Sequence, residues 1–225
     1  MVDTSKIIAS HLNLEPNRAA VLRDLYRAAA SGVDNFLVNE NMLQCVMDEV
    51  LASNLNIKVS PIIAFPIGQW YWGAKKAAID ALGPIQNGPT VLMHSVGPWL
   101  DGHDIAKEEW QELSKIEGEK WVMTSLSAIP NERYDELADE LAAAKIHSLI
   151  LSNGVKASGL QSPDSNQIKA FAKSVNGRLR IVARISDKLT TTQCEKYIEA
   201  GADAITSDHF WNLINQNNDR EGAIK

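Results

Sequence analysis

The chain has 225 residues, of which 45% are hydrophobic and 22% are charged, and its formal net charge at pH 7 is −6. These values are ordinary for a globular protein, and they exclude a disordered, collagen-like or coiled-coil chain. The acidic balance and the lack of an arginine-rich run argue against nucleic acid or an anionic membrane as a partner.

Short apolar runs alternate with amphipathic stretches along the whole chain. The apolar runs predict strands, at 6–9, 33–38, 57–65, 90–93, 121–123, 149–151, 179–183 and 204–206. The amphipathic stretches predict helices, which run from Glu15-Pro16 to Gly32 and then over 42–52, 70–82, 105–116, 131–144, 163–175, 191–200 and 210–216.

This alternation predicts the fold class. Eight strand-then-helix units with brief loops and no Pro/Gly/Ser-rich linker favour one domain over 1–225, folded as a closed (β/α)₈ barrel. An open doubly wound sheet is the structural alternative. That fold would carry a glycine-rich phosphate loop after its first strand, and the Ser-His-Leu-Asn stretch at 10–13 is not such a loop.

Cysteine usage and hydropathy restrict cofactors and location. Cys45 and Cys194 are far apart, and no C-x-x-C pair or Cys/His cluster exists, so we expect neither a disulfide framework nor a bound metal or other cofactor. No apolar stretch approaches the roughly 18 residues of a membrane span, and residues 1–6 lack a long apolar targeting core. The sequence therefore predicts a cytoplasmic protein with no membrane partner.

Polar residues follow seven of the predicted strands. In (β/α)₈ barrels the chemistry takes place at the C-terminal ends of the strands, so these residues are the candidate site residues. They are Ser10, His11, Asn39, Glu40, His94, Ser95, Thr124, Ser125, Ser152, Asn153, Arg184, Ser186, Asp187, Ser207, Asp208 and His209. The alternative is that strand ends are exposed, and therefore polar, in any barrel.

Several of these side chains suit acid/base chemistry. The histidines at strand ends (His11, His94 and His209) suit proton transfer near neutral pH, with Asp187 as a further acid/base group. Arg184 is predicted to hold a carboxylate or an enolate. A metal site built from these histidines and the neighbouring carboxylates is an alternative that the spacing does not support.

Tryptophan is abundant, with six residues beside four Phe and four Tyr. Trp70 and Trp72 follow Phe65 closely, Trp99 follows the fourth strand and Trp211 the eighth. Aromatic side chains at a pocket mouth would form an apolar wall that suits a ring or an acyl group. The alternative is that these side chains pack in the core, or seal loops or a subunit contact.

Two segments carry a family resemblance. Residues 61–68, Pro-Ile-Ile-Ala-Phe-Pro-Ile-Gly, resemble the strand-three motif G-F-P-L-G of deoxyribose-phosphate aldolases, and residues 199–207, Glu-Ala-Gly-Ala-Asp-Ala-Ile-Thr-Ser, resemble their last strand. Weaker similarities occur at 10–11 and 36–39. The resemblance covers most of the chain in order and spacing, and it implies an aldolase-type barrel that self-associates as a homodimer.

The resemblance also implies a mechanism from which this chain departs. The family forms a Schiff base between a strand-six lysine and the substrate carbonyl, with a strand-seven lysine that lowers the pKa of the first. Here Leu151 is predicted to occupy the strand-six position, residues 181–184 contain no lysine, and residues 90–94 lack the family's strand-four aspartate. Arg184 can supply a positive charge, but a guanidinium cannot form a Schiff base.

The phosphate-binding loops of the family are changed as well. Where the resemblance implies glycine-rich turns, this chain has Ser186-Asp187 and Ser207-Asp208-His209. An aspartate repels a phosphate dianion strongly once both are shielded from water. The sequence therefore predicts a substrate without a phosphate group.

These observations lead to one functional hypothesis and two alternatives. The hypothesis is a lyase-like enzyme that acts on a small carbonyl substrate by acid/base chemistry. The first alternative is a non-catalytic barrel that binds a ligand at its mouth. The second is an aldolase in which Lys156, in the loop after the sixth strand, serves as a relocated Schiff-base lysine. Against the latter, a loop lysine is ordinarily a solvated charge with little nucleophilicity.

Overall fold

The computed structural model describes residues 3–156, 159–186 and 189–213, apart from the side chains of 155–156 and 159–160. Parallel strands close into a barrel in the order β1-β10-β9-β6-β5-β4-β3-β2. The barrel strands are β1 (Ile7–His11), β2 (Asn35–Asn39), β3 (Lys58–Ile63), β4 (Thr90–Met93), β5 (Lys120–Ser125), β6 (Ser148–Ser152), β9 (Arg180–Arg184) and β10 (Ala204–Ser207).

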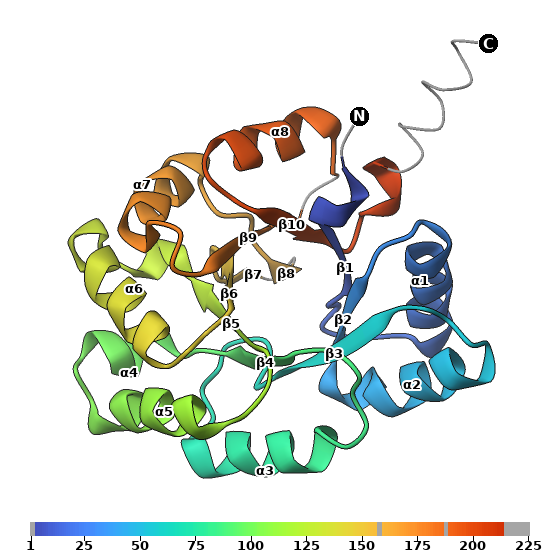
Figure 1. Ribbon diagram of the computed structural model, residues 1–225, viewed down its shortest axis with the longest axis horizontal. Helices are drawn as coiled ribbons and strands as arrows, with labels where there is room; N and C mark the ends of the chain where they lie inside the picture. Colours follow the sequence, from blue (N-terminus) through green and yellow to red (C-terminus); the bar gives the residue numbers. More distant parts are fainter. Residues whose placement is uncertain (1–2, 157–158, 187–188, 214–225) are drawn as a thin grey trace.

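Helices surround the barrel as an outer ring (Figure 1). They are α1 (Arg18–Ala30), α2 (Leu43–Ala52), α3 (Trp72–Leu82), α4 (Val96–Leu100), α5 (Asp104–Lys115), α6 (Tyr134–Ala143), α7 (Ser165–Val175) and α8 (Thr191–Glu199). Short 3₁₀ helices cover Thr4–Lys6, Glu40–Met42, Leu126–Ala128 and Asn131–Arg133. A small antiparallel hairpin, β7 (Val155–Lys156) with β8 (Gly159–Leu160), follows β6.

The predicted (β/α)₈ barrel is confirmed, and the open sheet is excluded by the closed strand order. The bounds of β4 are those predicted, whereas β1 and β9 continue into the polar residues at their C-terminal ends. The sequence analysis missed α4 and the β7–β8 hairpin. Of the helix predicted at 210–216, residues 211–213 are helical and the rest lies outside the described residues.

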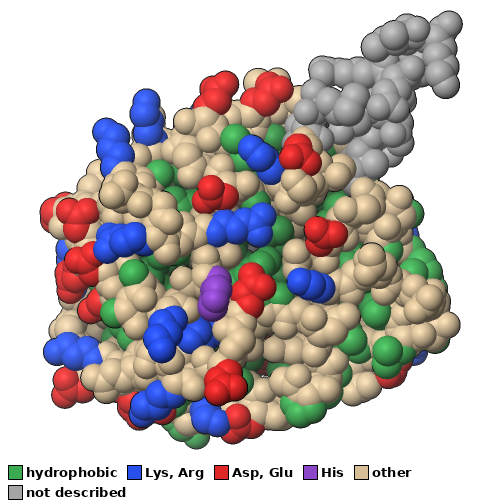
Figure 2. Space-filling model, viewed as in Figure 1, with side chains coloured by type: hydrophobic (Ala, Val, Ile, Leu, Met, Phe, Trp, Pro, Cys, Tyr) green, Lys and Arg blue, Asp and Glu red, His purple; other side chains and the backbone are tan. Residues whose placement is uncertain are grey.

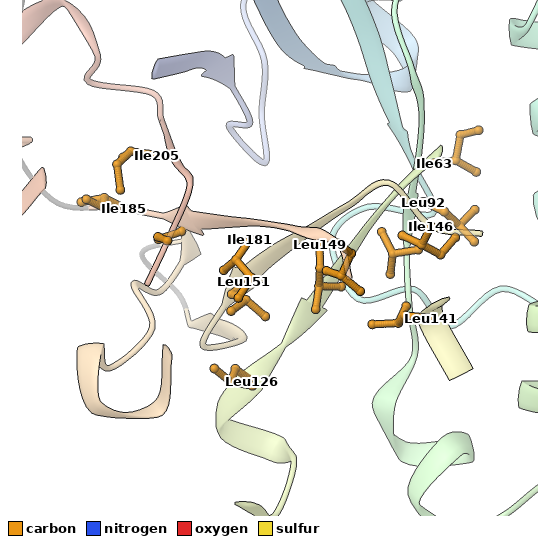
Figure 3. Packing of buried hydrophobic residues seen from close by; sticks show 14 of the residues in the cluster. Ile63, Leu92, Leu126, Leu141, Ile146, Leu149, Leu151, Ile181, Ile185 and Ile205 are labelled. Carbon is orange, nitrogen blue, oxygen red and sulfur yellow. The ribbon is translucent and has the colours of Figure 1, made fainter. Parts of the chain in front are cut away.

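Two apolar layers hold the barrel together. One cluster consists almost entirely of strand residues, among them Ile8, Ile150 and Val182, and fills the barrel interior. The other joins strand residues such as Leu151 to the surrounding helices, and Figure 3 shows part of it. Since successive side chains of a strand point to opposite faces, each strand-end residue belongs either to the interior or to the helix-facing layer.

Gly68 allows the loop after β3 to cross the end of β4. Its φ is +71°, and a Cβ atom there would lie 2.6 Å from the Met93 carbonyl oxygen and 2.7 Å from the His94 carbonyl carbon. Both contacts are shorter than real Cβ atoms make, and neither involves a side chain that can move away. The glycine therefore holds this loop against the end of β4.

We expect Gly68→Ala to lower the free energy of unfolding by about 2–5 kcal/mol, since the left-handed backbone costs about 1–2 kcal/mol and the overlap about 1–3 kcal/mol. Gly102→Ala is the matched control, because Gly102 has φ +69° with nothing within 4 Å of the added Cβ. Urea unfolding of both variants measures the difference. Equal losses would show that the close approach at Gly68 contributes nothing.

Candidate functional site

An inward-facing polar cluster closes the end of the barrel interior. Ser10 lies two residues after Ile8 and Arg184 two after Val182, so both share the face of those interior residues. Arg184 Nη2 donates to Asp208 Oδ2 at 2.6 Å, and Nη1 donates to the Ser10 hydroxyl oxygen at 3.2 Å. The first and the last two strands of the barrel therefore meet in one ion-paired network.

Asp208 is ionised within this network. Burial by itself would raise the pKa of this carboxyl group, but the positive charge of Arg184 and hydrogen bonds from the Ser10 hydroxyl and the Leu12 amide lower it below its ordinary value. The Ser10 hydroxyl donates to Oδ1 at 2.8 Å and the Leu12 N–H at 3.0 Å. The cluster thus pairs a buried guanidinium with a carboxylate whose oxygens are already satisfied.

His11 faces the other way, towards α1. It continues the face of Ala9, which packs in the helix-facing layer, and its Nδ1 lies 2.9 Å from Asp24 Oδ2. The other oxygen of Asp24 accepts from Arg23 Nε at 3.2 Å and from Arg27 Nη1 at 3.3 Å. With Asp24 as the acceptor, Nδ1 of His11 carries a proton, so the uncharged form of the ring has its lone pair on Nε2.

One cavity of about 630 Å³ brings these two groups together. Its walls include six residues from β1, α1 and the segments at the ends of β9 and β10: His11, Asp24, Arg184, Asp208, His209 and Trp211. Trp211 forms one wall, with the Arg27 guanidinium 5.1 Å from its ring centre and the His209 ring edge-on at 5.3 Å. Three predicted catalytic residues, His11, Arg184 and His209, therefore line one cavity.

Three buried polar atoms of this cavity's residues lack a hydrogen-bond partner among the described residues: Nε of Arg184, Nε2 of His11 and the hydroxyl oxygen of Ser186. The first is a donor and the second an acceptor. Buried polar atoms are ordinarily paired, so an unpaired donor and an unpaired acceptor in the wall of one cavity call for a ligand or for water. This pair is the most specific chemical feature of the cavity.

A smaller cavity of about 260 Å³ lies beside the first and shares Leu14 with it. Three predicted substrate-binding residues line it: Asn39, Glu40 and Phe65. Glu40 Oε1 accepts from the Ala64 N–H at 2.5 Å, and burial raises the pKa of this carboxyl group above its ordinary value despite that hydrogen bond.

His94 and Trp70, predicted to belong to the same site, line a different cavity of about 350 Å³ between α3, α4 and α5. His94 follows Met93, which faces the barrel interior, and so points outwards to the helices. The prediction that Trp72 belongs to an aromatic pocket wall is wrong. Its side chain is only 8% exposed and packs in the helix-facing core.

The remaining predicted residues lie at the barrel rim or outside the described part. The Ser152 hydroxyl donates to the Thr124 carbonyl, Asn153 Nδ2 donates to Gln167, and the Ser207 hydroxyl accepts from the His209 N–H. Ser125 is half-buried, with its hydroxyl 3.4 Å from that of Ser127. Asp187 lies outside the described residues. The backbone of Lys156 lies in β7, and its side chain is outside the described part.

Leu151, the residue predicted to occupy the strand-six lysine position, does not face the barrel interior. Leu151 faces the helices, in the same layer as Leu126, Leu149 and Ile181 (Figure 3), and Ile150 faces the barrel interior. Of these two residues Ile150 projects into the barrel, on the face that it shares with Ser148 and Ser152. Neither residue is a lysine.

The charges around the cavities and on the surface are mixed. Figure 2 shows acidic and basic side chains interspersed over one face of the molecule. Within residues 3–156, 159–186 and 189–213, no three His, Cys, Asp or Glu side chains gather in a metal-binding arrangement. In the same part of the chain no helix has the length and apolar character needed to cross a bilayer.

Comparisons with known proteins place the fold. No protein-family model and no curated protein matches this sequence. Among solved structures it is similar to an aldolase called QR15, with a TM-score of 0.85 and 15% identity over 100% of both chains. It is also similar to the tetrameric deoxyribose-phosphate aldolase of Aeropyrum pernix, with a TM-score of 0.80 and 16% identity over 96% of this chain and 90% of that one. The resemblance read from the sequence is thus confirmed at the level of architecture: the chain is a (β/α)₈ barrel of the aldolase type.

Proposed function

We propose that this protein is a lyase that cleaves or forms the carbon–carbon bond of a small β-hydroxy carbonyl compound by acid/base chemistry. The observation that carries the proposal is the buried, unpaired donor of Arg184 and the buried, unpaired acceptor of His11 in the wall of one cavity. A β-hydroxy carbonyl compound supplies the complementary pair, since its carbonyl oxygen accepts and its hydroxyl group donates.

In the cleavage direction His11 Nε2 removes the proton of the substrate hydroxyl group. The oxygen lone pair then forms the new C=O bond, the carbon–carbon bond breaks, and its electrons form an enolate whose oxygen lies against the Arg184 guanidinium. The imidazolium returns the proton to the enolate carbon, so that an aldehyde and a second carbonyl compound leave. Asp24, 2.9 Å from His11 Nδ1, holds the ring in the required tautomer.

The charges of the cavity favour a substrate without phosphate. Asp24 and Asp208 line it together with Glu15, against Arg23 and Arg184. Because acidic side chains outnumber basic ones, a phosphate dianion is disfavoured there. A neutral substrate avoids that repulsion, and Trp211 offers its apolar part a flat surface.

We expect His11→Asn to lower kcat for β-hydroxy ketone cleavage by about 10²–10⁴-fold, because asparagine keeps a donor for Asp24 but has no basic lone pair. The assay measures release of formaldehyde and acetone from 4-hydroxy-2-butanone, of acetone from diacetone alcohol and of acetaldehyde from 3-hydroxybutanal, with phosphorylated analogues in parallel. His103→Asn is the matched control, since His103 is exposed and lies outside this cavity. Activity retained in His11→Asn, or no cleavage of any compound by the unmodified protein, would overturn the proposal.

Borohydride treatment in the presence of each substrate tests the imine alternative. Acid/base cleavage predicts no stable adduct on any lysine by intact mass. An adduct mapped to Lys156 would instead favour Schiff-base chemistry from the hairpin after β6. Binding of the same compounds without turnover or adduct would favour a non-catalytic barrel.

A further inference from the structure

The cavity that His94 and Trp70 line is separate from the proposed catalytic cavity and lies outside the barrel. It has a volume of about 350 Å³ and is bordered by the loop before α3, by α4 and by α5. None of its lining residues lines the 630 Å³ cavity. Its walls are mostly apolar, and they include Trp70, Tyr71, Pro98, Ile105 and Ala106.

The inner end of this cavity carries a buried network of charged side chains. Lys75 is fully buried, and its Nζ donates to Glu109 Oε2 at 2.5 Å and to the Met93 carbonyl oxygen at 3.1 Å. The other oxygen of Glu109 lies 3.1 Å from His94 Nδ1. His94 and Glu109 both line the cavity, whereas Lys75 lies behind them.

This network fixes the chemistry that His94 offers to the cavity. Burial by itself would raise the pKa of Glu109, but the hydrogen bonds from His94 and Lys75 and the positive charge of Lys75 lower it. Glu109 is therefore a carboxylate that accepts from His94 Nδ1–H, and with the proton on Nδ1 the uncharged form of the ring carries its lone pair on Nε2. That Nε2 is buried and has no hydrogen-bond partner among the described residues.

The rim of the cavity is unusually apolar for a surface. Trp70 is 44% exposed, Tyr71 70% and Ile105 52%, and all three border this one opening. Large apolar side chains gathered around a concave site are typical of a ligand-binding surface. The ring of Trp110, with its centre 4.4 Å from that of His94, holds the imidazole in place.

We propose that this cavity binds a small, neutral, flat ring compound that bears one N–H or O–H group, which donates to His94 Nε2 while the ring packs against Trp70, Pro98 and Ile105. A cavity of about 150 Å³ already holds benzene, so 350 Å³ accommodates a bicyclic ring. The carbon–carbon lyase reaction proposed above does not use this site, and the inference stands independently of it.

Indole and indene are the matched probes, since they have nearly the same shape and only indole carries an N–H donor. We expect calorimetric titration to show indole binding at least about 10-fold more tightly than indene, the difference that one buried hydrogen bond provides. The His94 imidazole resonances are expected to shift with indole. Equal affinities for the two probes, no binding of either, or unshifted His94 resonances would each overturn the proposal.

Variants locate the binding in this cavity. Ala106→Leu fills this cavity, does not touch the 630 Å³ cavity, and is expected to weaken indole binding by about 10-fold or more. Ile105→Ala removes an apolar contact at the exposed rim and is expected to weaken binding to the same extent. Because Ile105 is exposed, its variant tests the site even if the buried Ala106 variant does not fold. Trp211→Ala, in the first cavity, is expected to leave indole affinity unchanged. Loss of binding in Trp211→Ala alone would assign the indole to the first cavity and overturn the proposal.

Discussion

Replacing Lys75 with methionine is expected to lower the free energy of unfolding by about 3–5 kcal/mol, the cost of removing one partner of a buried ion pair. The lysine side chain is 0% exposed and that of Glu109 6%, so water cannot replace the lost cation. Glu109 would be left as a buried carboxylate that keeps only its contact with His94, and the Met93 carbonyl oxygen would lose the Lys75 donor. Guanidinium unfolding at pH 7 measures the loss.

Two further variants identify the cause of that loss. Lys75→Met combined with Glu109→Gln removes both charges, keeps an acceptor for His94, and is expected to recover much of the stability. Lys76→Met, one residue along the same helix, breaks an exposed pair with Asp80 and is expected to change stability by less than about 1 kcal/mol. A similar loss in the Lys75 and Lys76 variants would contradict the network described here.

Replacing Arg184 with methionine is expected to abolish carbon–carbon cleavage and to lower stability by about 3 kcal/mol, the lower end of the range for a broken buried pair. The lower end applies because the Asp208 side chain is 27% exposed. Adding Asp208→Asn to this variant is expected to restore stability but not activity. Recovery of activity in the double variant would show that Arg184 does not stabilise the enolate.

The pH dependence of stability provides a second test of the same pair. The pKa of Asp208 is lowered in the folded protein, so its contribution is present above the ordinary carboxyl pKa and is lost as pH falls through the lowered value. In Arg184→Met burial raises that pKa instead, and stability is expected to rise as pH falls from neutral towards the ordinary carboxyl range. Thermal unfolding from about pH 3 to about pH 7, which spans the carboxyl titrations, distinguishes the two slopes.

The barrel was predictable because each strand and each helix has its own local signal. Apolar runs such as 90–93 are bounded by polar or glycine residues, and the helices between them show regular apolar spacing. The face of each strand residue was not predictable in the same way. Parallel strands buried on both faces carry continuous apolar runs, so 149–151 has no alternation that separates Ile150 from Leu151.

The same ambiguity explains which site residues were missed. Lys75 and Glu109 lie on helices, where charged residues are ordinarily solvated, and nothing in their spacing marks them as buried. Their network with His94 forms only because the His94 side chain, directly after β4, points outwards to the helices. Arg184 and Asp208 were predictable as candidates because both lie at strand ends, but their ion pair and its hydrogen bonds with Ser10 depend on how the barrel closes.

The pairing of β1 with β10 has a consequence for how this protein matures. Ser10 is 198 positions from Asp208 and 174 from Arg184, so the first cavity joins the first strand of the barrel to its last two. A ribosome-bound chain has no such cavity until its last strand has emerged and docked. A compound that binds there stabilises only the fully closed molecule, so its binding reports closure of the barrel.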